Sequence, residues 1–249
     1  MTTKFIGKNI IKLDSVDSTN NYLVSFSKNN KTTDGTIIIS QNQTDGRGNA
    51  DNYWESEKGK NLTFSLLLYP EVIQVSNHFC ISKAISLSIV DFLKLYTDNI
   101  SVKWPNDIYV NDKKIAGTLI ENFISGNIFS KTIIGIGLNI NQVAFKSDAP
   151  NPVSLKNITN IDFNLNACMD LLLAFIETRY YQLKTIEGIN KINTEYLKSL
   201  YKFNVFAKYE SNSEIFNAKI IDVEDSGKLI VVDENLKKSA FNFKEIKFI

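Results

Sequence analysis

Apolar residues in the first part of the chain fall into short runs that predict strands, with one helix among them. Residues 62–68 carry apolar side chains at every second position, a period typical of a strand with one face in the core. The β-branched run 35–41 predicts another strand, and residues 9–16 a third. Between those two strands we expect a helix that begins at Ser18 or Thr19, since either side chain suits the N-cap position.

The middle of the chain predicts a long helix followed by further strands. Apolar residues recur at helical spacing over 77–96, which indicates one amphipathic helix. Residues 108–121 predict a hairpin around an Asn-Asp turn, and residues 131–141 another buried strand. The segment 141–160, which contains prolines, predicts an irregular surface loop. Together the strands predict a mixed or antiparallel sheet.

The pattern changes near residue 200. Helical spacing over 169–183 and a shorter helix over 188–200 precede it. From Tyr201 onward, short apolar strands alternate with turn residues, which predicts a small β-barrel or sandwich of about 50 residues. We therefore expect an α+β fold with two domains: residues 1–199, a mixed central sheet with flanking helices, and residues 200–249, the small β-domain.

Composition and charge narrow the functional classes. The chain has 249 residues and a net charge of +1, from 28 basic and 27 acidic residues, so no overall basic field favours DNA binding. No stretch approaches the roughly 18 apolar residues of a membrane span. Cys80 and Cys168 lie far apart in apolar helical patterns, which predicts reduced thiols and a cytoplasmic protein. His78, the sole histidine, excludes a multi-histidine metal site and is expected to pack against its helix.

The glycine-rich stretch DGRGNAD, residues 45–51, is the first candidate for chemistry. It lacks the strand-turn-helix context of a dinucleotide-binding loop, because the expected next element is a strand. Two glycines flank Arg47, so backbone N–H groups and the guanidinium could approach an anion together. A mobile surface loop that happens to carry one arginine is the alternative.

The stretch KWPNDIYVNDKKIAG is the second candidate. It places Lys103 and Lys114 on either side of a turn and a hairpin, with Asp107 between them. Pro105 fixes the local backbone and thereby the direction of the side chains that follow it. Two ammonium groups and a carboxylate in one compact unit suit an acyl phosphate. A charged hairpin around a packed Trp104 is the structural alternative.

These motifs, taken in order, resemble the biotin protein ligase family over nearly the whole chain, from DSTN at Asp17 to the final FKEIKFI. The pieces that carry the resemblance are GRG, Trp54 with the following ES, Gly59, Asn61-Leu62, Ser65, KWPND, Lys114, Gly117 and GIGLNIN. A lysine eleven residues beyond the lysine of KWPND is highly specific, and the ordered set is more specific still.

The resemblance implies a fold similar to class II synthetases with an SH3-like C-terminal barrel. It also implies that biotin and ATP, with Mg²⁺, form biotinyl-5'-AMP, and that a lysine of a biotin carboxyl carrier protein then accepts the biotin. The implied biotin-binding residues are Ser18, Thr19, Asn20, Gln43, Gly46, Arg47, Gly48, Asn49, Trp54, Lys114 and Gly117. The implied nucleotide-binding residues are Arg47, Gly48, Asn61, Asn106, Asp107, Lys114 and Asn139. The implied catalytic residues are Lys103, Lys114, Arg47 and Asp107.

Several alternatives stay open. Ser18 or Thr19 could only cap a helix, Trp54 could belong to the core, and Asn139 could satisfy a backbone group. Mg²⁺ has no strong direct ligand set and would bind near Asp107. A lipoate or octanoate ligase of related fold, and a protein that binds biotin or its adenylate without transferring it, are the alternative functions.

The sequence also departs from the family pattern. The usual basic run GRGRRG is here GRGNAD, so Asn49, Ala50 and Asp51 replace two arginines and a glycine, which questions how well the adenylate is retained. Lys58 and Lys60 could partly compensate. Only about sixteen residues precede DSTN, so we expect no DNA-binding helix-turn-helix and no repressor function. A homodimer formed through an edge strand is left open.

Overall fold

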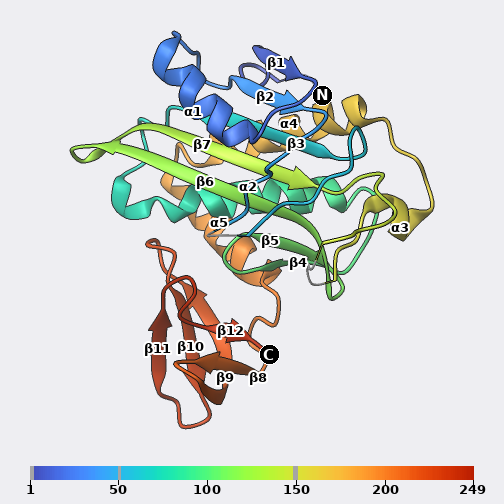
Figure 1. The fold of residues 1–249 in the computed structure, drawn as a ribbon. Coiled ribbons are helices and arrows are strands. Elements are labelled where there is room, and N and C mark those ends of the chain that lie inside the picture. The colour runs from blue at the N-terminus through green and yellow to red at the C-terminus, as the bar shows by residue number, and fades with distance from the viewer. Residues whose placement is uncertain (1–2, 50–51, 148–150) are drawn as a thin grey trace.

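The computed structural model describes residues 3–49, 52–147 and 151–249 and has two β-sheets (Figure 1). The larger sheet is mixed and carries helices on both faces. The smaller sheet, formed by the C-terminal part of the chain, is antiparallel. The expected α+β fold class, a mixed central sheet with flanking helices and a separate C-terminal β-unit, is confirmed. The division at residues 199 and 200 stays a prediction.

The larger sheet has seven strands in the order β1-β2-β3-β7-β6-β5-β4. Only β1 and β2 pair in parallel, and the remaining neighbours are antiparallel. The strands are β1 (Ile10–Leu13), β2 (Ile37–Ser40), β3 (Leu62–Leu68), β4 (Ile100–Lys103), β5 (Asp107–Val110), β6 (Lys113–Ser125) and β7 (Ile128–Leu138).

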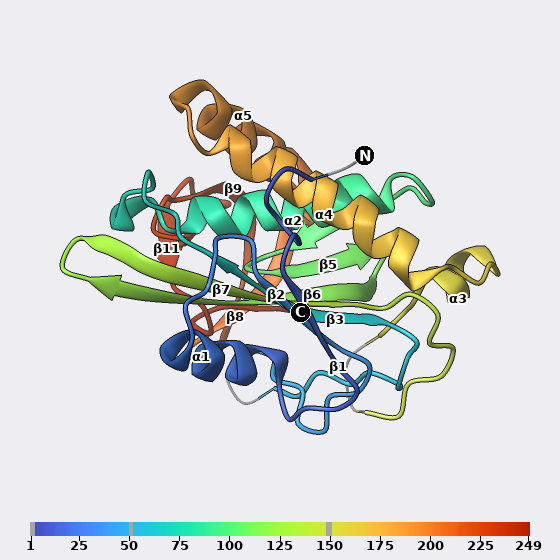
Figure 2. The same ribbon diagram turned by 90° about the horizontal axis from the view of Figure 1, so that it is seen from above.

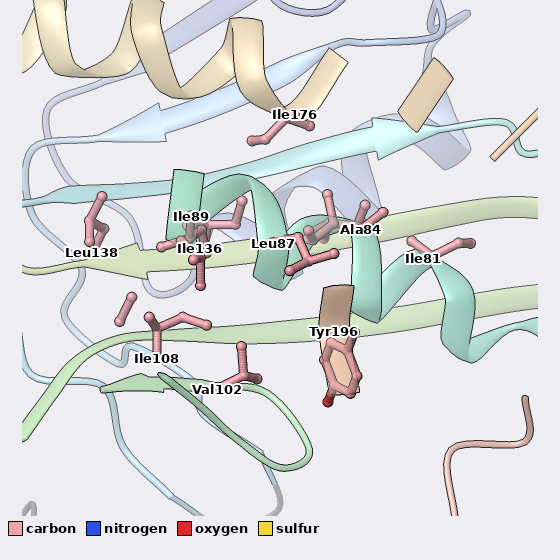
Figure 3. Close-up of a cluster of buried hydrophobic side chains, with 14 of the residues drawn as sticks. Ile81, Ala84, Leu87, Ile89, Val102, Ile108, Ile136, Leu138, Ile176 and Tyr196 are labelled. Carbon is pink, nitrogen blue, oxygen red and sulfur yellow. The ribbon is translucent and has the colours of Figure 1, made fainter. Parts of the chain in front are cut away.

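Helices cover the two faces of this sheet unequally (Figure 2). One face is covered by α2, α4 and α5, and the other by α1. The helices are α1 (Thr19–Asn29), the 3-10 turn η1 (Val75–Asn77), α2 (Phe79–Leu93), α3 (Leu155–Thr159), α4 (Leu165–Gln182) and α5 (Ile186–Ser199). Apolar side chains of α2 fill the main core between the sheet and α4 and α5 (Figure 3).

Alternation along β7 separates the core from a second, polar surface. Ile134 and Ile136 point into the main core, while Ile133 packs with Leu23 of α1 on the opposite face. Since side chains of a strand alternate, the next residues on the α1 face are Gly135 and Gly137. The α1 face of the sheet therefore lacks large side chains at this point, and space is left there for a cavity.

The smaller sheet has five strands in the order β11-β10-β9-β8-β12. They are β8 (Ala207–Ser211), β9 (Glu214–Val223), β10 (Leu229–Asp233), β11 (Lys238–Phe241) and β12 (Lys247–Phe248). The buried Lys83 of α2 joins this sheet to the larger domain, because its Nζ donates to the carbonyl of Val223 at 3.1 Å and to Asn193 Oδ1 at 2.9 Å. This buried polar contact links the small sheet to α2 and α5.

The structure differs from the sequence-based expectation in two places. Residues 100–103 form the edge strand β4, which was not expected because four residues with one buried side chain show too little alternation. The expected irregular loop 141–160 contains α3, which begins with a capping box between Ser154 and Asn157. That capping box uses Asn in place of the usual Glu or Gln, so the common sequence signature is absent.

The two cysteines, the histidine and the helices can be compared with what the composition predicted. Cys80 and Cys168 are free, buried thiols, and burial raises the pKa of Cys80 to about 12. His78 lies half-buried at the start of α2, with its Nδ1 3.2 Å from the carbonyl oxygen of Val75. Within the described ranges, none of the helices combines the length and apolar character needed to cross a membrane.

Candidate active site

A cavity of about 250 Å³ opens on the α1 face of the large sheet. It brings together most of the residues that the sequence singled out, although they come from four separate segments. Those that line it are Ser18, Thr19, Asn20, Gln43, Arg47, Gly48, Asn49, Trp54, Lys103, Asn106, Asp107, Lys114 and Gly117. The two motifs GRG and KWPND therefore face one common space.

Glycines on β6 and β7 form the floor of the cavity. Gly117 and Gly137 pair across the two strands, and the indole of Trp54 lies on them: a Cβ at Gly137 would come within 2.2 Å of its ring. A Cβ at Gly135 would come within 2.4 Å of Asn20 Oδ1. These positions require glycine because larger residues would displace the side chains above them. Trp54 is thus a wall of the cavity and not part of the core.

One end of the cavity is neutral and hydrogen-bonded. Gln43 Oε1 accepts from the backbone N–H of Thr19 at 2.8 Å and from its hydroxyl at 3.0 Å. Ser65 Oγ lies 2.8 Å from Thr19 Oγ1 and 2.5 Å from Asn20 Oδ1. Ser18 is the N-cap residue of α1, but its side chain makes no cap hydrogen bond within the described chain. Its buried hydroxyl is therefore not used for capping.

The opposite end of the cavity is charged. Lys114 Nζ forms an ion pair with Asp107 Oδ1 at 2.7 Å and lies 5.7 Å from the centre of a ring of Trp54. A bulge in the β5–β6 pairing, between Ile108 and Tyr109, places Lys114 beside Asp107. Both side chains are about one quarter exposed. This pair therefore lies where a ligand in the cavity can reach it.

Lys103 is the second cation at the charged end. Its backbone lies opposite that of Asp107 in the antiparallel pairing of β4 and β5. Its Nζ lies 5.1 Å from the ring centre of Tyr109 and 5.2 Å from that of Phe248. Burial, with the nearby charge of Lys114, lowers the pKa of Lys103, while Asp107 acts in the opposite direction. The side chain is held by aromatic rings, with Phe248 supplied by the small C-terminal sheet.

The GRG loop folds back on itself as a short hairpin beside the cavity. Gly48 donates its N–H to the carbonyl of Asn52, and Trp54 to that of Gly46, both at 2.7 Å. This geometry brings Trp54 back over the floor, and it explains the requirement for Gly46, where a Cβ would come within 2.4 Å of the carbonyl oxygen of Trp54. Of the departures from the family pattern, Asn49 lines the cavity, whereas Ala50 and Asp51 lie outside the described residues.

The KWPND turn is anchored from both sides. Trp104 donates its indole N–H to the carbonyl of Gly227, in the turn between β9 and β10, at 2.9 Å. Asn106 donates its side-chain amide to the carbonyl of Thr118 on β6. Phe243, also from the C-terminal part, lines the cavity next to Trp104. The two β-units therefore build this wall together.

Three of the residues implied by the resemblance lie outside the cavity lining. Gly46 shapes the hairpin described above. Asn61 donates to Gln142 Oε1 at 2.6 Å and accepts from the N–H of Ile140 at 3.0 Å, so its amide joins two loops. Asn139 donates to the carbonyl of Val153 at 3.1 Å, while its Oδ1 is buried with no partner among the described residues. Direct ligand contacts of these residues stay predictions.

Sequence reasoning missed a clamp between the loop that carries Trp54 and the segment after β7. Glu55 accepts from the N–H groups of Lys146 and Ser147 at 2.7 to 3.0 Å, and from Gln142 Nε2 at 3.1 Å. Burial alone would raise the pKa of Glu55, but the hydrogen bonds from Ser147, Lys146 and Gln142 outweigh it and lower the pKa. Local sequence patterns carry no signal for this clamp, because Glu55 and its partners are about 90 residues apart in the sequence.

Sequence reasoning also missed other residues that line the cavity, and some had a signal. Gly135 and Gly137 belong to GIGLNIN and stand at alternate positions of one strand, which predicts a close approach on one face. Tyr53 and Phe243 had no comparable signal. For the described residues, no group of three or more His, Cys, Asp and Glu is arranged to hold a metal ion.

One cavity of this α+β fold thus brings together a glycine floor, a covering tryptophan and a Lys–Asp pair, and the comparisons with known proteins identify the class as a ligase. Residues 13–139 match the Biotin/lipoate A/B protein ligase family, and the chain belongs to that family. The bifunctional ligase/repressor BirA of Bacillus spizizenii is 27% identical over 247 residues, covering 96% of this chain and 74% of its own. The biotin--[acetyl-CoA-carboxylase] ligase of Paracoccus denitrificans is 26% identical over 207 residues, with 78% and 82% covered.

Solved structures of biotin protein ligases share the fold of this chain. The biotin protein ligase from Aquifex aeolicus in complex with biotin and ATP superimposes with a TM-score of 0.79 at 25% identity, covering 97% of this chain and 99% of that one. The biotin protein ligase from Leishmania major in complex with biotinyl-5-AMP, at 20% identity and a TM-score of 0.63, shows the shared fold alone.

Proposed function

We propose that the protein is a biotin protein ligase. In the first step the biotin carboxylate attacks the α-phosphorus of ATP, so that a carboxyl C–O–P bond forms, the bond to the β-phosphate breaks and pyrophosphate leaves. In the second step a neutral lysine amine of a carrier protein attacks the acyl carbon of biotinyl-5'-AMP. The C–O bond breaks, and AMP and a proton leave.

The observation that carries this proposal is the single cavity with a neutral end and a charged end. Biotin has a neutral polar ring system at one end and a carboxylate at the other. The network of Thr19, Gln43 and Asn20 suits the ring, and Lys114 with Lys103 suits the carboxylate and the phosphate next to it. Trp54 covers the floor between them, which limits water at the reacting atoms.

The proposed chemistry of the first step is positioning and charge neutralisation. The carboxylate is already a nucleophile, so no general base is needed. Lys114 would neutralise the carboxylate and later the acyl phosphate, after giving up part of its pairing with Asp107. Arg47 and Gly48 would bind the phosphate, and Asn106 and Asp107 the nucleotide. For the second step Asp107 is the group proposed to orient or deprotonate the acceptor amine.

Mg²⁺ is proposed to enter with ATP. Among the described residues the cavity lining has one carboxylate, Asp107, which is too small a donor set for a protein-built site but fits a cation that phosphate and water mainly hold. When bound, the ion would neutralise phosphate charge during departure of pyrophosphate. The acceptor is proposed to be a biotin carboxyl carrier domain, whose lysine would enter at the rim, where Tyr53 and Phe243 are exposed and line the cavity.

Incubation with ATP, Mg²⁺, biotin and a biotin carboxyl carrier domain, followed by intact mass measurement, tests the function. We expect the carrier to gain one biotinyl group in an ATP-dependent way. Parallel reactions offer lipoic and octanoic acid with a lipoyl carrier domain. Labelling only in these reactions would establish the alternative ligase activity, and binding of biotin without labelling of any carrier would indicate a binding protein.

A further inference from the structure

Arg47 occupies an unexpected place for a residue assigned to an anion. Its Nη1 donates to Asn21 Oδ1 at 2.6 Å, and its Nη2 lies 3.3 Å from Glu121 Oε1. Asn21 is itself oriented by Asp17, whose Oδ2 accepts from the Asn21 amide at 3.1 Å. The guanidinium thus rests in an acceptor site built by the protein itself, at the edge of the cavity that Arg47 lines.

Glu121 reaches Arg47 because of its place on β6. Gly117 and Leu119 line the cavity, and Glu121 is the next residue on the same face of the strand. Its partner strand has Gly135 nearby, which leaves room for the side chain of Asn20 beside Glu121. The strand runs from the floor of the cavity to its rim, and the carboxylate of Glu121 therefore lies at the rim.

The second oxygen of Glu121 accepts from Asn20, one of the neutral side chains at the hydrogen-bonded end of the cavity. Asn20 Nδ2 donates to Glu121 Oε2 at 2.9 Å, while Asn20 Oδ1 accepts from Ser65. One carboxylate therefore holds a residue assigned to the ring of the ligand and the arginine assigned to the phosphate. Neither motif analysis nor the cavity lining includes Glu121, because it acts through these two neighbours.

We propose that Glu121 is a positioning residue that holds Arg47 at the rim in the ligand-free protein and competes with the nucleotide for its guanidinium. This inference rests on the proposed function for the identity of the anion. The side chains of Arg47 and Glu121 are 40% and 26% exposed, so their ion pair is weak and easily exchanged. A phosphate that binds the guanidinium through two parallel hydrogen bonds is the stronger partner. Glu121 therefore lowers the affinity for ATP without preventing its binding.

Direct binding of ATP, measured by calorimetry with biotin left out so that no adenylate forms, tests this competition. Glu121→Gln removes the carboxylate charge that faces Arg47 but keeps an oxygen that can accept from Asn20. We expect the Kd for ATP to fall about threefold, the size of a weak exposed ion pair, and the Kd for biotin to change less than twofold. The matched control is Glu71→Gln, which makes the same charge change at an exposed site away from the cavity and should leave the Kd for ATP unchanged.

Arg47→Ala provides the decisive comparison. If Glu121 acts through Arg47, then Glu121→Gln has no effect on ATP binding when Arg47 is absent. An equal effect in both backgrounds would overturn the inference, since it would indicate a general charge effect. An unchanged or higher Kd for ATP in Glu121→Gln alone would also overturn it. These measurements need no turnover, so they fail independently of carrier biotinylation, unless the wild-type protein binds no ATP, which would defeat both proposals.

Discussion

The two ends of the cavity are built in opposite ways. At the neutral end, Thr19, Asn20, Gln43 and Ser65 are buried and bond to one another. At the charged end, Lys114 and its acidic partner are about one quarter exposed and meet in an ion pair. The first arrangement is fixed before a ligand arrives, whereas the second can exchange its partners.

This difference assigns ligand discrimination to the neutral end and activation of the carboxylate to the charged end. Buried hydrogen-bonding groups discriminate strongly, because a ligand that fails to match them leaves polar atoms unpaired. Exposed ion pairs contribute little to stability, so they can be replaced by a reacting carboxylate and phosphate at small cost. Changes at the neutral end should therefore alter the binding of biotin, and changes at the charged end the rate of activation and the handling of phosphate.

The largest effect is expected at the charged end. Lys114→Ala removes the cation nearest to the proposed reacting groups, and biotin-dependent exchange of pyrophosphate into ATP should slow by about 10² or more. The neighbouring Lys113 is exposed and is not part of the cavity lining, so Lys113→Ala is the matched control and should retain the wild-type rate. An unchanged rate in Lys114→Ala would remove this residue from the reaction.

The next effect is expected at the neutral end. Gly135→Ala places a Cβ within 2.4 Å of Asn20 Oδ1, which forces Asn20 away from Ser65. Overpacking of this kind typically costs 1–3 kcal/mol, so biotin should bind about 30-fold more weakly. Titration of biotin by tryptophan fluorescence measures this, and ATP affinity serves as the internal control. Equal losses for biotin and ATP would show that the two ends are not separate.

A tenfold effect is expected from restoring a charge in the GRG hairpin. Asn49 lines the cavity where the family pattern has arginine, and Asn49→Arg would add a charge-assisted contact to the phosphate. Release of biotinyl-5'-AMP should slow about tenfold, equivalent to about 1.4 kcal/mol. A stopped-flow chase measures the rate, with Thr44→Arg, exposed in the same loop, as control. Equal release rates would mean that other groups replace the arginine, and Lys58 and Lys60 would be substituted next.

The smallest effect concerns salt. Raising the ionic strength from about 0.05 M to about 0.5 M shortens the Debye length roughly threefold, so attraction of ATP by partly exposed cations weakens. We expect the KM for ATP to rise a few-fold and the KM for biotin to change by less than about 1.5-fold. Steady-state exchange assays at both concentrations provide the comparison. A parallel rise in both constants would contradict the division of the site.

Much of the fold and the site could be predicted because the signals are local. Alternation over residues 62–68 identified β3, and the residues of GRG and KWPND stand in turns whose geometry depends on nearby glycine and proline. Membership of the ligase family, which the order of these short motifs predicted, is confirmed by the family match over residues 13–139.

The features that escaped prediction are contacts between distant segments. Glu121 meets Arg47 across 74 residues, and the clamp of Glu55 on Ser147 spans 92 residues. In each case the sequence shows a glutamate without its partner. Its role becomes visible only when the fold brings that partner next to it. The edge strand β4 escaped for a different reason, since it is too short to show a period.

The contribution of Phe243 to the cavity wall has a consequence for protein synthesis. Trp104 is anchored by the carbonyl of Gly227, and Phe243 lines the cavity beside it. Domains generally fold in order as the chain leaves the ribosome, N-terminal part first. The large sheet can therefore form early, but the wall next to the KWPND turn is incomplete until Gly227 and Phe243 have been translated. A nascent chain that ends before Phe243 would carry the GRG and KWPND motifs beside a cavity that lacks part of its wall.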